Sequence, residues 1–186
     1  MRREVDRASP SPADLPLWYA QVSSMPSRTE SKIPYPLPLP ADRARTADSS
    51  RPTLMVVVDT EEEFDWEAGF DRKNTSVEHM ADIGLLQAVF DESGVTPLYV
   101  VDFPIATQRA SLLPLCDFMS RSRCEIGAHL HPWVSPPFEE DVNARNSYPG
   151  NLPRELERAK LEQLVSAIER NFGRRPRAYK AGRYGA

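Results

Sequence analysis

The sequence lacks the features of a membrane-spanning or nucleic-acid-binding protein. None of its apolar runs approaches the roughly 20 residues that a helix needs to cross a bilayer. Basic residues are not in excess: the net charge is -4, whereas phosphate contacts need a basic face. No apolar segment follows Arg2 and Arg3, as it would in a secretory signal peptide. We therefore expect a protein with no membrane span and no nucleic-acid partner, located in the cytoplasm.

Cysteine is also scarce, and Cys116 and Cys124 are the two in the chain. One lies in a helix-like apolar pattern and the other lies beside a predicted strand. A disulfide between them is one alternative, but buried free thiols fit a reducing compartment better. A zinc site built on two cysteines would need a shorter spacing. We therefore expect two free thiols.

The composition that remains is that of a globular protein, with 40% hydrophobic and 27% charged residues. A length of 186 residues allows one domain with a hydrophobic core. Residues 1–52 are rich in proline and serine, and Pro34, Pro36 and Pro38 alternate with other residues. This alternation predicts an extended, flexible arm rather than a helix. The folded domain is expected to comprise residues 53–186.

Short apolar runs alternate with helical patterns from Thr53 onwards. The strand-like runs are TLMVVVD (53–59), TPLYVVD (96–102), CEIGAH (124–129) and RAYKAG (177–182). Apolar residues recur at helical spacing in segments 76–94, 112–122 and 152–173. Such alternation predicts an α/β fold with a parallel sheet, and the continuous apolar run 53–59 is typical of a strand covered on both faces. A closed barrel of eight units needs roughly 250 residues, so we expect a partial (β/α) barrel.

Imidazole side chains follow one of these strands. In EIGAHLHPW (125–133), one residue separates His129 from His131, so the two side chains point the same way if the backbone is extended. Two such imidazoles can bind one divalent cation at about 2.0–2.1 Å. An alternative is a pair of polar histidines on an exposed edge. The carboxyl ends of parallel strands gather the active site in such folds, which favours the metal site.

Carboxylates follow the first strand in DTEEEFDW (59–66). If the strand continued, Asp59, Glu61 and Glu63 would share one face, whereas Glu62 would point away. We expect Glu61 to be the acidic metal ligand and Asp59 to be the base that takes a proton from water activated by the metal. Glu62 and Glu67 are expected to be solvated.

Aromatic residues close both motifs. Trp66 and Trp133 could offer ring faces to a sugar, and core packing is an equal alternative for either residue. Asp102, at the end of the second strand, is a weaker candidate for a functional residue. The segment that follows Trp133 is long and proline-rich, which indicates a loop that faces the substrate or an ordinary connection.

Together, VVVDTEEEFDW, EIGAHLHPW and KAGRYGA resemble, in this order, the motifs of the polysaccharide deacetylase family, the chitooligosaccharide deacetylase-like metal hydrolases. The resemblance covers residues 53–186, and the DTEEEFDW form is similar to a subfamily found near polysaccharide biosynthesis genes. It implies a distorted (β/α) barrel of seven units and a divalent metal, which we expect to be zinc. It also implies a hydrolase of carbohydrate metabolism that removes acetyl groups from N-acetylated sugars.

The resemblance also assigns roles to individual residues. It implies that Asp59 is the catalytic base and that His129 and His131 bind the metal. An arginine that orients the base would be Arg183, although Lys180 is an alternative match. The family's general-acid histidine would lie beyond Ala186, so we expect residues 1–186 alone to associate and to have little activity.

Two other functions remain open at this point. The chain could be a non-catalytic remnant that binds a metal or a carbohydrate. It could also be a glycosidase with paired carboxylates, but that mechanism leaves the two histidines unexplained. The sugar and the oligomeric state are not specified by the motifs.

Overall fold

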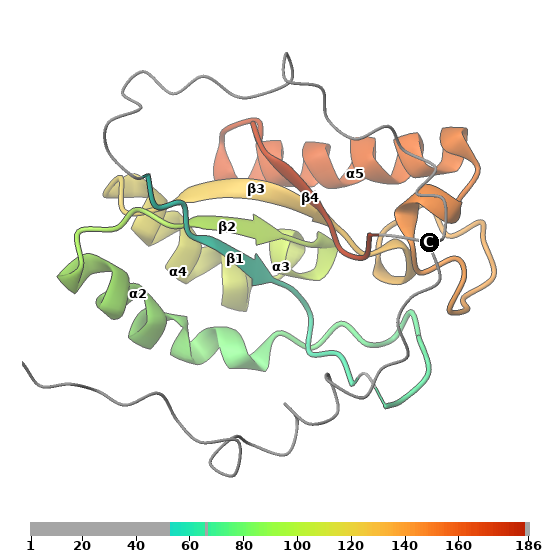
Figure 1. Cartoon of the computed structure of the whole chain (residues 1–186), viewed down its shortest axis with the longest axis horizontal. Helices are drawn as coiled ribbons and strands as arrows, with labels where there is room; N and C mark the ends of the chain where they lie inside the picture. The colour runs from blue at the N-terminus through green and yellow to red at the C-terminus, as the bar shows by residue number, and fades with distance from the viewer. Residues whose placement is uncertain (1–52, 66, 185–186) are drawn as a thin grey trace, which may run out of the picture. The chain divides into compact units, whose positions relative to one another are not determined.

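The computed structural model describes residues 53–65 and 67–184 (Figure 1). The predictions for the arm 1–52 and for Trp66 lie outside the described residues. In chain order the elements are β1 (Val57–Thr60), η3 (Glu78–Asp82), α2 (Ile83–Glu92), β2 (Leu98–Val101), α3 (Phe103–Thr107), α4 (Arg109–Ser120), β3 (Glu125–Leu130), η4 (Pro132–Val134), η5 (Pro149–Asn151), α5 (Arg154–Phe172) and β4 (Tyr179–Ala181). None of the helices among these residues is long and apolar enough to cross a membrane.

The four strands form one parallel sheet in the order β1-β2-β3-β4. The sheet curls like half of a barrel, with the helices lying outside it (Figure 1). The register places Asp59 beside Val100 and Val100 beside Gly127, and it places His129 beside Lys180. The predicted parallel α/β sheet is therefore confirmed, and all four strands direct their carboxyl ends to the same side.

The two faces of the sheet have different environments. Tyr99, Val101, Ala128 and Leu130 are buried against the helices and form the hydrophobic core with them. On the opposite face, Val57 is 40% exposed. The prediction that the first strand is covered on both faces is wrong for the described residues, because β1 is an edge strand whose second face is partly open. The strand is also shorter than predicted.

Local signals set the ends of the helices. Gly94 and Gly173 follow α2 and α5 with φ angles of 64° and 70°, in the left-handed region that glycine adopts without strain. The apolar stripe of α2 is less buried than its spacing suggests. Val89 is exposed, whereas Gln87 is buried and accepts a hydrogen bond of 3.0 Å from the Tyr99 hydroxyl. The polar group therefore takes an inward-facing place on this helix.

Both cysteines are free thiols, as expected. Cys124 is buried, and Cys116 is half-buried on α4.

A buried lysine fixes the segment that follows β3. Lys160 occupies the inner stripe of α5, and its Nζ donates to the carbonyl oxygens of Pro132, Ser135 and Pro137 at 3.0, 2.7 and 2.6 Å. It also forms an ion pair of 2.9 Å with Glu140, which is almost fully buried. The ammonium group thus holds together the backbone directly after His131.

We expect Lys160→Met to lower the free energy of unfolding by about 3–5 kcal/mol, because it removes the partner of a buried carboxylate and of the carbonyl groups of Ser135 and Pro137. Denaturant titration measures the change. Arg158→Met on the exposed side of the same helix is the control, since its ion pair with Glu155 is solvated and worth at most about 1 kcal/mol. Equal denaturation midpoints for the two variants would show that Lys160 does not support the fold.

Candidate metal centre

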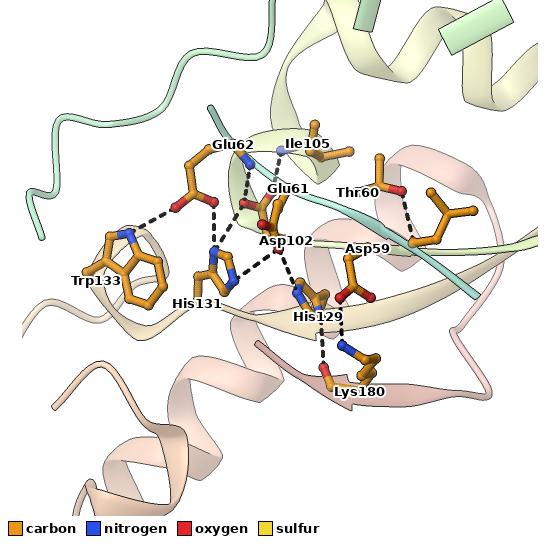
Figure 2. A network of polar contacts seen from close by, with 11 residues as sticks. Asp59, Thr60, Glu61, Glu62, Asp102, Ile105, His129, His131, Trp133 and Lys180 are labelled. Atoms are coloured by element: carbon orange, nitrogen blue, oxygen red, sulfur yellow. Dashed lines mark hydrogen bonds and ion pairs between the residues drawn. The ribbon is translucent and has the colours of Figure 1, made fainter. Parts of the chain in front are cut away.

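Three side chains that could hold a metal ion meet at the carboxyl end of the sheet (Figure 2). Glu61 directly follows β1, His129 lies in β3, and His131 follows β3. One ligand atom from each of the three residues lies within 4.8 Å of the other two. Both histidines are fully buried, whereas Glu61 is partly exposed. The predicted pair of histidines and the predicted acidic ligand therefore lie together.

The spacing of these atoms suits a small cation. Oε2 of Glu61 lies 3.0 Å from Nε2 of His129 and 3.3 Å from Nε2 of His131. Ligand atoms bound tetrahedrally at about 2.1 Å would be about 3.4 Å apart. Little movement is needed to bring all three to bonding distance of one ion.

The hydrogen bonds of His129 also fit a metal ligand. Its Nδ1 lies 3.0 Å from the carbonyl oxygen of Lys180, which can only accept. Its Nε2 faces Glu61, which also accepts when ionised. A neutral imidazole has one N–H, so donation from Nδ1 leaves the Nε2 lone pair directed at the carboxylate. A cation between the two groups resolves this conflict.

His131 has the same arrangement with a different partner. Its Nδ1 lies 2.8 Å from Oε2 of Glu62, whereas its Nε2 is buried without a hydrogen-bond partner among the described residues. Burial lowers the pKa of His131 to about 4, so the ring is neutral at physiological pH. A neutral imidazole whose Nδ1 is held by a carboxylate and whose Nε2 is unpaired is typical of a metal ligand.

The electrostatics of Glu61 favour its ionised form. Burial by itself raises the pKa of Glu61, but the hydrogen bond with His129 and the electrostatic interactions with both histidines outweigh burial and lower the pKa overall. The third ligand is therefore a carboxylate anion beside the imidazole nitrogens of His129 and His131. These residues fit a divalent cation such as zinc, which binds imidazole and carboxylate groups.

The prediction that Glu62 is solvated is wrong. Its side chain is 2% exposed, and its two oxygens take up different partners: Oε2 faces His131, and Oε1 accepts from Nε1 of Trp133 at 2.9 Å. The extended backbone ends at Thr60, so the alternation assumed for the acidic run does not apply beyond it. Glu67 is exposed, as expected.

Asp102 is the second buried acid behind the histidines, and it gives the end of β2 a role in the site. Its Oδ2 accepts from the backbone N–H of Glu62 at 2.9 Å, and its Oδ1 caps α3 by accepting from the N–H of Ile105 at 2.9 Å. Burial and the nearby Glu62 raise the pKa of Asp102 well above its usual range. Burial raises the pKa of Glu62 as well, but hydrogen bonds oppose that increase. Two buried carboxyl groups with raised pKa values thus lie behind the histidines.

The predicted base lies beside this centre with a lysine as its partner. Nζ of Lys180 lies 2.6 Å from Oδ2 of Asp59, and both side chains are partly exposed (Figure 2). Arg183 donates instead to Oγ of Ser147 at 2.6 Å and to the hydroxyl of Tyr148 at 2.9 Å. Of the two residues considered as partners of the base, Lys180 is the one that forms an ion pair with Asp59.

Trp133 is a packing residue in this structure. It is 1% exposed, and its ring stacks on that of His131 at a centroid distance of 4.3 Å. Phe64 and Phe70 contact it from other sides. The alternative of core packing therefore holds for Trp133, since its ring offers no exposed face to a sugar.

A cavity of about 260 Å³ opens at the opposite end of the strands. It is lined by apolar side chains that include Ile126 and Phe172, and Arg174, Arg175 and Arg177 stand around it. None of the candidate metal ligands lines it. The titratable groups that could perform chemistry lie at the carboxyl ends of the strands instead.

No family model, curated protein or solved structure matches the chain. Its function must therefore be inferred from the residues of the site and from the motifs that contain them.

Proposed function

We propose that the chain forms the metal-binding part of a hydrolase that removes acetyl groups from N-acetylated sugars. The observation that carries this proposal is the convergence of Glu61, His129 and His131, with the Nε2 atom of His131 buried, directed at Glu61 and without a hydrogen bond to any described residue. The bound cation, for which we propose zinc, would lower the pKa of a water molecule and polarise the acetyl carbonyl group.

Residues around the cation would accept the proton and orient the base and the ligands. Asp59 is the base, because it lies beside the ligands on a partly open face and no hydrogen bond to the ligands occupies it. Lys180 orients the carboxylate of Asp59 through their ion pair, and its backbone carbonyl fixes the ring of His129. One residue of β4 thus positions both the base and a ligand.

The choice of substrate rests on the three motifs and their order, which resemble those of the polysaccharide deacetylases. Two features of the site agree with hydrolysis of an amide: residues that could hold a cation, which would stabilise the oxyanion, and a separate carboxylate, Asp59, that could accept a proton. A paired-carboxylate glycosidase would not need the two imidazoles.

The direct test is release of acetate from N-acetylated sugar oligomers by the purified chain after loading with zinc. Acetate release that stops on chelation and returns with zinc would support the proposal. Zinc binding without acetate release would favour a non-catalytic metal-binding protein.

Where the chain releases acetate, we expect Asp59→Asn to reduce that release by about 100-fold or more and to leave zinc affinity within a few-fold of wild type. Asparagine keeps the shape of the side chain but cannot accept the proton. The control is Asp82→Asn, since Asp82 is exposed and makes no side-chain capping bond to α2. Loss of zinc in the Asp59 variant would instead identify Asp59 as a ligand.

A further inference from the structure

Glu62 is the only one of the three consecutive glutamates that is fully buried, and its two carboxylate oxygens face ring nitrogens: Oε1 accepts from Nε1 of Trp133, and Oε2 lies 2.8 Å from Nδ1 of His131. We propose that Glu62 is a positioning residue that holds His131 in the tautomer with its proton on Nδ1, with Trp133 fixing the carboxylate of Glu62 and Asp102 fixing its backbone N–H. The inference rests on the metal site of the proposed function and assigns a role to a residue outside the ligand set.

Three bonds define the orientation of Glu62. Its backbone N–H donates to Asp102, its Oε1 accepts from Nε1 of Trp133, and its Oε2 faces Nδ1 of His131 (Figure 2). Trp133 has a donor and no acceptor on its ring, so Oε1 of Glu62 is its acceptor. The remaining oxygen is thus directed to His131.

The ring of His131 is enclosed on several sides. It is stacked on Trp133 at an interplanar angle of 23°, and Gly182 lies so close that an added Cβ atom would be 2.0 Å from Cδ2 and 2.6 Å from Nε2. With the ring fixed, the partner of Nδ1 decides which nitrogen carries the proton. A carboxylate at Nδ1 leaves the lone pair on Nε2, the atom that faces Glu61.

An amide at position 62 cannot satisfy both ring groups. If the amide oxygen accepts from Trp133, the NH₂ group faces Nδ1 of His131 and moves the proton to Nε2. If the amide is reversed, two donors meet at Trp133. We therefore expect Glu62→Gln to weaken zinc binding about 10- to 100-fold, the range for loss of a group that orients a metal ligand.

The decisive variant removes the indole N–H of Trp133, which competes with His131 for the amide oxygen at position 62. In Glu62→Gln/Trp133→Phe, the amide oxygen is free to accept from Nδ1 of His131, and the NH₂ group occupies the place of the indole donor. We expect the double variant to bind zinc more tightly than Glu62→Gln and to regain the Nδ1–H tautomer. Trp133→Phe alone should keep this tautomer, and Glu67→Gln is the exposed control for the same substitution.

Two measurements test the inference. Competition with a chelator gives the zinc affinity, and ¹⁵N chemical shifts of the metal-free imidazoles give the tautomer. The inference is overturned if Glu62→Gln binds zinc with wild-type affinity and its His131 Nε2 is unprotonated. It is also overturned if the double variant binds zinc no more tightly than Glu62→Gln. If Glu62→Gln does not fold, protonated Nε2 in the wild type or Trp133→Phe would overturn it as well. Because the tautomer is read without metal or substrate, absence of acetate release would count against the proposed function alone.

Discussion

Replacing His129 and His131 together with alanine is expected to abolish the binding of one zinc ion per chain. The two imidazoles supply both nitrogen ligands, and Glu61 alone cannot hold a transition metal against water. Calorimetry and elemental analysis measure stoichiometry and affinity. Zinc at 100 times its dissociation constant should stabilise the wild type by about 2.7 kcal/mol and the double variant not at all.

The chain contains a third histidine that serves as the control. His79 lies in η3, is partly exposed and pairs with Glu63 rather than with the ligands. His79→Ala should keep the wild-type stoichiometry and the stabilisation by zinc. Circular dichroism would establish that the double variant is folded. Unchanged zinc binding in a folded double variant would eliminate the proposed metal site.

The sheet and the pair of histidines were predictable because each depends on short periodicities. Alternation of apolar runs and helical patterns gives the parallel strands, and Gly94 and Gly173 mark the ends of two helices. His129 and His131 share a side because β3 remains extended up to Leu130. These features need no knowledge of distant contacts.

The residues behind the site were not predictable in the same way. The burial of Glu62 depends on where the chain leaves the sheet and on partners 69 and 71 residues away. The inward place of Lys160 depends on carbonyl groups in a loop more than 20 residues distant. A charged residue appears solvated in a sequence pattern unless its buried partners are known.

The choice between Lys180 and Arg183 as partner of Asp59 illustrates the same limit. Both are cations in KAGRYG, and spacing alone does not decide which of them faces the base. The register between β3 and β4 places Lys180 beside His129, from where its side chain reaches Asp59. Arg183 lies beyond the strand and bonds to Ser147 and Tyr148.

A single methyl group at Gly182 should disrupt the site more strongly than any substitution of comparable size. A Cβ atom there would lie 2.0 Å from Cδ2 and 2.6 Å from Nε2 of His131, and 2.6 Å from the carbonyl oxygen of Leu130. The ring is held by Glu62 and Trp133, and the carbonyl belongs to β3, so neither neighbour can move cheaply. Gly182 is therefore required for space.

We expect Gly182→Ala to lower the free energy of unfolding by about 1–3 kcal/mol, the usual cost of overpacking, and to weaken zinc binding by displacing the imidazole. Gly84→Ala is the matched control, because no atom lies within 4 Å of its added Cβ and α2 gains up to about 1 kcal/mol from alanine. The two variants should shift stability in opposite directions, and the Gly84 variant should bind zinc as the wild type does. If Gly182→Ala binds zinc with wild-type affinity, the ring of His131 can move without loss of zinc binding. That result would contradict the role of His131 as a ligand held in place by its neighbours.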